Sequence, residues 1–253
     1  DFLVSAECGT NTRKKRGAEY IYDDKADFNL HARATLYNTA VYIDVNQQVT
    51  DRLAISYGAR LSTFLRLGQK ELNVYENGQA IRFNNDLQFY EKIDPIGFKS
   101  DGHGKVIKSF MNLEPRVALS YQLDEETSIK TSYNRMAQYL HLLSNTSSPT
   151  PLDVWAPSGT YIQPQILDQV AIGYFKNYER YSLEVESFYK ITQNRIDYID
   201  GANLIANKAI EQIVLNGQSR AYGMELLFRK NKGRFKGWFA YTLSKSEQQT
   251  KGR

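Results

Sequence analysis

The chain of 253 residues has few of the residues that build most metal and catalytic sites. Cys8 is its single cysteine, which excludes an internal disulfide and a cysteine-based zinc site. The three histidines, His31, His103 and His141, are far apart and have no neighbouring ligand at metal-site spacing. No segment approaches the run of about 18 apolar residues that a transmembrane helix needs. These absences exclude membrane helices but leave open a protein that crosses a membrane with strands.

Charge clusters and catalytic motifs are also sparse. The net charge is +4, and the basic residues are scattered apart from the run Arg13 to Arg16, so nothing predicts a nucleic-acid surface. That run fits a solvated loop. No G-x-S-x-G motif is present, and the acidic residues are spread over several predicted strands. We therefore expect no enzyme, no cofactor and no metal site.

Aromatic residues and a strict alternation are what the sequence does contain. The chain has 18 Tyr and 12 Phe, which favour strands. The segment RLAISYGARLSTF, residues 52–64, alternates apolar side chains with small or charged ones, and this period of two predicts a strand with one apolar face. The same alternation recurs and predicts eight strands, at about 37–47, 53–65, 113–123, 127–135, 168–176, 181–191, 219–229 and 234–245.

The connections between these strands alternate in length. Short turns separate the members of each pair, and long loops at about 66–110, 140–166 and 192–218 separate the pairs. A soluble sandwich or propeller has no reason to collect every long connection at one end, whereas outer-membrane barrels have short periplasmic turns and long extracellular loops. The sequence therefore favours an all-β fold, an antiparallel transmembrane β-barrel. The alternative is an antiparallel sheet half exposed to water.

In this interpretation the apolar face meets lipid and the polar face meets the lumen. Pro115 has no N–H for a ladder and is expected at a bulge or at the rim of a strand. A register slip there or around Arg135 would exchange the faces locally. The residues expected to face lipid are Val41, Ile43, Leu53, Ile55, Tyr57, Leu61, Val117, Leu119, Tyr121, Leu183, Val185, Leu226, Phe228, Phe239 and Tyr241.

The loop at 140–166 is the best candidate for ligand binding. It holds four of the six prolines, which stiffen a loop, together with His141, Trp155 and Tyr161. Aromatic side chains offer an apolar face with a polar group, so these three residues are the predicted ligand contacts. The alternative is that each of them packs the loop onto the barrel wall.

Three segments resemble one known family. They are YNTAVYIDVNQQVTDRLAISYGARLSTF, PQILDQVAIGYFKN and SRAYGMELLFRKNKGRFKGWFAYTLSKSE, and they are similar to recurring barrel strands of TonB-dependent outer-membrane receptors of Gram-negative bacteria. The resemblance covers about residues 35–250. It implies a barrel of about 22 strands filled by a plug domain. We therefore expect about eight strands of a larger barrel, with the plug domain outside this chain.

The resemblance also implies a function and a set of partners. Such a receptor binds a nutrient, for example a siderophore, cobalamin, a glycan or a peptide, at its extracellular loops and imports it through the plugged barrel. The expected partners are outer-membrane lipid and lipopolysaccharide, a TonB-type energy-coupling protein that acts on regions outside this chain, and a surface lipoprotein lid. The expected location is the bacterial outer membrane. The alternative function is a barrel that does not transport and serves as a scaffold of a surface assembly.

Overall fold

The computed structural model describes residues 2–11, 36–68, 72–102, 104–144, 154–204 and 209–250. The basic run Arg13 to Arg16, His31 and His103, which the sequence analysis considered, lie outside these residues. Among the helices of the described part, none is long and apolar enough to cross a membrane.

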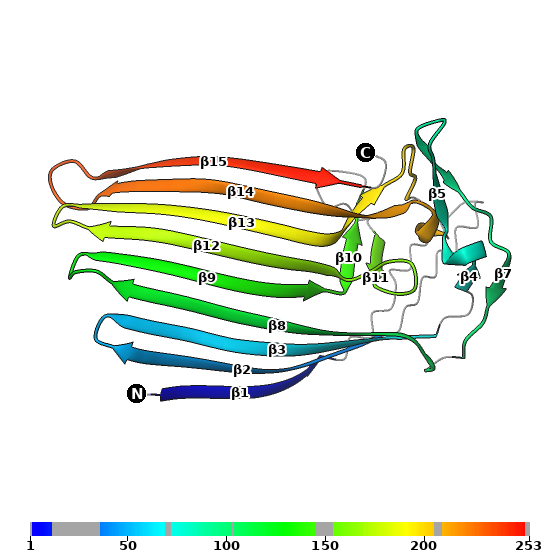
Figure 1. Cartoon of the computed structure of the whole chain (residues 1–253), viewed down its shortest axis with the longest axis horizontal. Coiled ribbons are helices and arrows are strands. Elements are labelled where there is room, and N and C mark those ends of the chain that lie inside the picture. Colours follow the sequence, from blue (N-terminus) through cyan, green and yellow to red (C-terminus); the bar gives the residue numbers. More distant parts are fainter. Residues whose placement is uncertain are drawn as a thin grey trace, which may run out of the picture.

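Nine strands form one antiparallel sheet, and each strand pairs with the next one in the order β1-β2-β3-β8-β9-β12-β13-β14-β15 (Figure 1). The outermost strands of the sheet, β1 and β15, do not pair with each other. The strands are β1 (Phe2–Asn11), β2 (Leu36–Thr50), β3 (Leu53–Leu67), β8 (Val106–Gln122), β9 (Thr127–Gln138), β12 (Gln165–Asn177), β13 (Tyr181–Tyr198), β14 (Val214–Lys230) and β15 (Gly237–Gln249).

This architecture confirms the predicted all-β, antiparallel fold. The sequence analysis did not predict β1, which is the ninth strand of the sheet. The short turns lie together at one end of the sheet and the long connections at the other (Figure 1). We name these the turn end and the loop end.

The strands are longer at the loop end than the alternation predicts. β8 already begins at Val106, and β13 and β14 pair as far as Tyr198 and Val214, so the predicted loops 66–110 and 192–218 are too long. A bulge between Gln193 and Arg195 is one reason, because an extra residue breaks a period of two. The predicted loop 140–166 contains two short strands, and β15 begins at Gly237 instead of 234 because the preceding turn is longer.

The register divides the side chains of the sheet into two faces. Residues that are paired across antiparallel strands lie on the same face of the sheet. Pairings such as Val41↔Leu61 and Tyr57↔Val117 therefore trace each face from strand to strand. All fifteen residues predicted to face lipid lie on this one face, which we call the outer face. The opposite, inner face is concave and buries Ser62, at 1% exposure. The charged residues Asp44, Arg60, Glu114, Arg116, Lys130, Glu184, Glu186, Lys190 and Glu225 lie on the inner face.

Pro115 marks a fork in the sheet, and it lies neither at a bulge nor at the rim of a strand, the two places that we expected. The β3–β8 ladder continues through Ala59↔Pro115 without a shift. The β8–β9 ladder ends at Arg116↔Asn134, and towards the loop end β8 pairs only with β3, and β9 only with β12. A proline cannot donate to a ladder, which explains why a ladder ends beside it. No register slip occurs at Arg135, which pairs regularly with Asp168.

Side chains bridge this fork on the inner face. Tyr139 follows β9, and its hydroxyl accepts a hydrogen bond of 2.8 Å from Asn112 Nδ2 of β8 and lies 2.8 Å from Ser62 Oγ of β3. Its ring stacks on Phe64 with a centroid distance of 5.0 Å. Ser62 Oγ also donates to the buried carboxylate of Glu114 at 2.5 Å. The two parts of the sheet are therefore joined by a buried polar network where their ladder is missing.

Candidate ligand-binding site at the loop end

The described parts of three long connections, which fall within residues 68–105, 139–164 and 199–213, gather at the loop end of the sheet (Figure 1). Several aromatic residues of the first connection lie in and around short antiparallel hairpins. The short elements are β4 (Leu72–Val74) paired with β7 (Gly97–Lys99), β5 (Ile81–Asn84) paired with β6 (Phe89–Lys92), β10 (Leu140–Leu143) paired with β11 (Val154–Pro157), and the 3₁₀ turns η1 (Glu76–Gly78) and η2 (Ile210–Gln212).

These connections share one apolar core. One buried cluster contains Leu143 and Ile162 of the second connection and Ile213 of the third. Ile81 and Tyr90 of the β5–β6 hairpin pack against that cluster. Burial of apolar surface from three connections stabilises their arrangement relative to one another. The loop end is therefore a packed unit and not a set of independent loops.

A polar network centred on Glu211 joins the same three connections. Glu211 Oε1 accepts hydrogen bonds from Tyr75 Oη at 2.8 Å and from Asn73 Nδ2 at 2.9 Å. Tyr161 Oη donates to the carbonyl oxygen of Asn73 at 2.7 Å, and its ring lies edge-on to Tyr75 at 5.3 Å. Burial, together with the hydrogen bond to Glu211, raises the pKa of Tyr75, so its phenol remains a donor at neutral pH. Each connection thus contributes at least one group to the network.

The predicted ligand contacts occupy different environments. His141 lies on β10 and is 1% exposed, with Nε2 at 3.0 Å from Ser158 Oγ and Nδ1 at 3.3 Å from Gln165 Nε2. Burial lowers the pKa of His141 to about 4, so its ring is neutral. Both ring nitrogens are engaged, which makes His141 part of the support of the β10–β11 hairpin.

Trp155 and Tyr161 lie nearer to solvent. Trp155 pairs with Leu142, the residue that follows His141 on β10, and Trp155 is 48% exposed. Tyr161 is partly buried and is fixed through its hydroxyl by Asn73. Of the three predicted contacts, Trp155 offers the most accessible surface to a ligand.

The loop end also contains a hollow that the sequence did not predict. It has a volume of about 290 Å³ and lies between the β5–β6 hairpin and the beginning of β14. Phe83 and Tyr90 meet edge to face in it at 5.0 Å, and the Arg82 side chain pairs with Glu91 at its edge. The aromatic content of this segment was visible in the sequence, but the approach of β14, more than a hundred residues away, was not.

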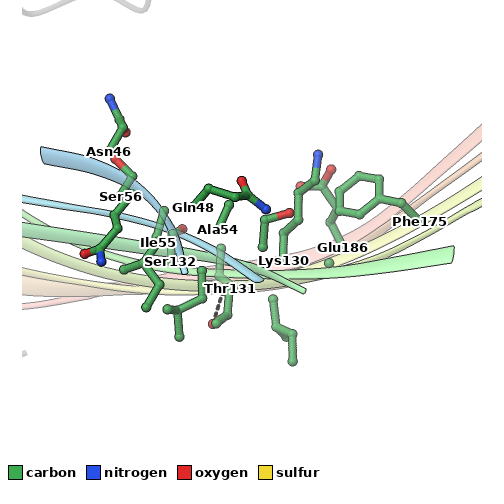
Figure 2. Close-up of a pocket in the computed structure, with 17 residues that line it drawn as sticks. Asn46, Gln48, Ala54, Ile55, Ser56, Lys130, Thr131, Ser132, Phe175 and Glu186 are labelled. Carbon is green, nitrogen blue, oxygen red and sulfur yellow. Dashed lines mark hydrogen bonds between the residues drawn. The ribbon is translucent and has the colours of Figure 1, made fainter. Parts of the chain in front are cut away.

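The inner face of the sheet holds a larger hollow of about 560 Å³ (Figure 2). Small side chains form its floor, and Lys130 and Glu186 rise from the sheet beside it, with Lys130 Nζ 4.7 Å from the ring centroid of Phe175. A Cβ on Gly173 would collide with the Phe175 ring, so this position requires glycine or a shift of that ring. The small residues are Ala54, Ser56, Ala118, Ser120, Ser132, Ala171 and Gly173.

Within the described ranges, no three histidine, cysteine or acidic side chains come together as a metal site. The described loop end presents a surface of aromatic and polar groups next to a wall whose inner face is polar.

The family model described as TonB dependent receptor-like, beta-barrel, matches residues 7–253. The chain belongs to this family. Membership accounts for the alternating faces and the one-sided loops, and it places this receptor in the bacterial outer membrane. The nine-stranded sheet is part of the wall of its barrel.

Solved structures support the same fold. The ferric yersiniabactin uptake receptor FyuA from Yersinia pestis is 14% identical with a TM-score of 0.52, over 85% of this chain and 28% of that chain. The ferric-catecholate import receptor Fiu from E. coli K12 is 17% identical with a TM-score of 0.53, over 98% of this chain and 34% of that chain. The chain thus spans about a third of the length of these structures. No curated protein matches the chain.

Proposed function

We propose that this receptor binds a nutrient at the loop end and imports it through the barrel, driven by a TonB-type protein that acts on regions outside this chain. In this proposal the loop end faces the outside of the cell and the fifteen outer-face residues meet lipid. The inner hollow beside Lys130 and Glu186 lies along the wall of the polar lumen.

The observation that carries the proposal is the packing of three connections into one unit at a single end of the sheet. A loop that is already ordered loses less conformational entropy when it binds, so a packed surface binds a small ligand more tightly than loose loops do. The half-exposed ring of Trp155 and the hollow containing Phe83 and Tyr90 supply apolar contact, and Arg82 supplies a cation. Such a surface suits a ligand with an aromatic or anionic part.

The ligand class is the finer part of the proposal. Siderophores, cobalamin, glycans and peptides are the classes to compare. FyuA and Fiu are described as receptors for ferric chelates. Ferric siderophores of the catecholate type are therefore the first probes to try.

Binding to the intact receptor, purified in detergent, tests this function. We expect one of a panel of ferric siderophores, cobalamin, oligosaccharides and peptides to bind with a Kd that Trp155→Ala weakens by about tenfold, since a central aromatic contact contributes about 1–2 kcal/mol. The matched control is Trp238→Ala, because Trp238 is also exposed, at 73%, but lies at the turn end. Uptake of the same ligand by cells should require TonB. A folded receptor that binds no member of the panel would favour the scaffold alternative.

A further inference from the structure

The dipeptide Asn-Gly occurs twice in the chain, at residues 77–78 and 216–217, and each copy is followed by glutamine. In this dipeptide the backbone nitrogen of glycine can attack the side-chain amide of the preceding asparagine with little hindrance, because glycine has no Cβ beside that nitrogen. The two copies therefore share their local chemistry. They differ in the structure that holds them, and this difference decides which of them can react.

The first copy lies in an exposed turn. Asn77 and Gly78 belong to η1, and their φ values of 55° and 67° are a left-handed conformation that asparagine and glycine adopt at little cost. The Asn77 side chain makes no hydrogen bond to a described residue, and a Cβ built on Gly78 would meet nothing within 4 Å. The Gly78 N–H donates to the carbonyl oxygen of Tyr75 at 3.1 Å. Attack therefore requires the opening of one hydrogen bond and a rotation about ψ of Asn77, which is 17° in the turn.

The second copy is held in place by the sheet. Gly217 is buried in the β13–β14 ladder, and a Cβ built on it would lie 2.7 Å from the carbonyl oxygen of Gln249. Both polar atoms of the Asn216 side chain are engaged. Its Nδ2 donates to the carbonyl oxygen of Tyr161 at 3.1 Å, and its Oδ1 accepts from the backbone N–H of Gln163 at 3.4 Å. Asn216 can therefore react only after this part of the ladder opens.

We propose that Asn77 is a site of spontaneous deamidation, with water as the co-reactant. The Gly78 nitrogen gives up its proton and attacks Cγ of Asn77. A new N–Cγ bond forms, the Cγ–Nδ2 bond breaks, and the amide leaves with a proton as ammonia. Water then opens the resulting succinimide at one of its two carbonyl carbons. Opening at Cγ yields aspartate, and opening at the main-chain carbonyl yields isoaspartate, in which the main chain runs through the former side chain.

Either product changes the loop end. Both add a negative charge beside Glu76, and isoaspartate also lengthens the main chain by one carbon. The turn is closed by the hydrogen bond from Gly78 to Tyr75 and by one from the Gln79 N–H to the carbonyl oxygen of Glu76, at 3.3 Å, and the extra carbon alters their spacing. Tyr75 is 2% exposed and donates to Glu211. The modified turn therefore adjoins the polar network that joins the three connections.

The test follows both sites in the intact receptor, purified in detergent and incubated at mildly alkaline pH. Peptide mapping by mass spectrometry measures the deamidated fraction at each site over time, and electron-transfer fragmentation distinguishes isoaspartate from aspartate. The receptor unfolded in guanidinium is the reference, in which the two sites should react at similar rates. In the folded receptor we expect Asn77 to react about a hundredfold faster than Asn216, which corresponds to about 2.8 kcal/mol of additional local opening at Asn216.

Two matched variants assign the product. Asn77→Gln has a longer side chain that would have to close a less favoured ring, so this variant should lose the acidic species that ion-exchange chromatography resolves. Asn216→Gln makes the same change at the held site and should keep that species. Equal rates at the two sites in the folded receptor would show that the reaction proceeds through unfolding. That result would overturn the proposal, and so would a folded receptor in which Asn77 stays intact while the unfolded reference reacts.

The pH dependence tests the chemical route. The attacking group is the deprotonated Gly78 nitrogen, so the rate at Asn77 should rise with pH. A rate that rises towards acidic pH would indicate direct hydrolysis of the side-chain amide and would contradict the cyclic route. Nutrient binding does not enter any of these measurements, so their outcome is independent of the proposed function.

Discussion

On β3 the outer face presents Tyr57 and Leu61, which are 42% and 38% exposed, whereas the inner face of the same strand buries Ser62 and Phe64 at 1%. In the proposed orientation the outer residues need only an apolar neighbour, which lipid would supply without a fixed geometry. The inner residues depend on named partners, Glu114 and Tyr139 among them. The two faces of one strand therefore tolerate different changes. The outer face tolerates a change of shape but not an added charge, whereas the inner face tolerates an added charge but not the loss of a specific partner.

Introducing a charge at each of two adjacent residues of β14 should give the largest difference in stability between the two faces. Leu226 lies on the outer face with Val185 and Tyr241, and Leu227 lies on the inner face with Glu184 and Ala240. We expect Leu226→Arg to lower the free energy of unfolding by about 2–4 kcal/mol and Leu227→Arg by less than about 1 kcal/mol, because only the first places a charge in hydrocarbon. Guanidinium unfolding of the intact receptor in lipid vesicles measures both. Equal losses would show that the faces are assigned wrongly.

Removal of one hydroxyl should reveal the specific contacts of the inner face. Tyr139→Phe deletes the hydroxyl that contacts both Ser62 and Asn112 on the other side of the fork. It leaves buried polar atoms without that partner. The expected cost is about 1–2 kcal/mol. Tyr174→Phe, on the outer face of β12, is the control and should change stability by a few tenths of a kcal/mol at most, since that residue is exposed on the outer face. Thermal unfolding in detergent compares the two, and a larger effect at Tyr174 would refute the contrast.

The buried His141 extends the same contrast to pH. Its pKa is about 4 in the folded receptor and 6.5 ordinarily, so between these values the unfolded chain takes up a proton that the folded chain does not. Stability of the β10–β11 hairpin is therefore complete above pH 6.5 and falls as the pH falls through this window. A decrease from pH 6.5 to 5.5 should cost roughly 1 kcal/mol.

Amide hydrogen exchange of residues 140–143 and 154–157, corrected for the intrinsic effect of pH, measures this loss. His141→Gln retains a polar side chain without a titrating ring, so its protection should not change between pH 6.5 and 5.5. An unchanged slope in this variant would show that another group is responsible.

The sequence predicted the outer face well because a period of two survives any error in strand length. A strand that is two residues longer or shorter keeps each side chain on its face, and all fifteen predicted residues share one face. Loop boundaries were harder. The alternation is broken by the bulge between Gln193 and Arg195, and it is also absent from the part of β14 that precedes Ser219. The sequence therefore carries no signal that the ladder continues towards the loop end.

The candidate site was predicted less completely, because it is made by contacts between distant segments. Glu211 and Tyr75 are 136 residues apart in the chain, and no local pattern links them. His141 was selected for its residue type, whereas its burial depends on Ser158 and Gln165, which reach it only when the hairpin forms. Pro115 was recognised as an irregularity, but a fork could not be distinguished from a bulge before the ladders on both sides of β8 were known.

The fork at Pro115 also has a mechanical consequence. Between Pro115 and the loop end, the described strands on either side behave as two leaves that are hinged along a short seam, Arg116 to Gln122. Within the part of the chain that the structure describes, the leaves can spread without breaking any backbone ladder, and side-chain contacts resist them. These are the contacts of Tyr139 with Ser62 and Asn112 at the fork, the Glu211 network and the shared apolar core of the loop end. The width of the opening at this rim is thus governed by side-chain packing and hydrogen bonds between the leaves and not by the strength of the sheet.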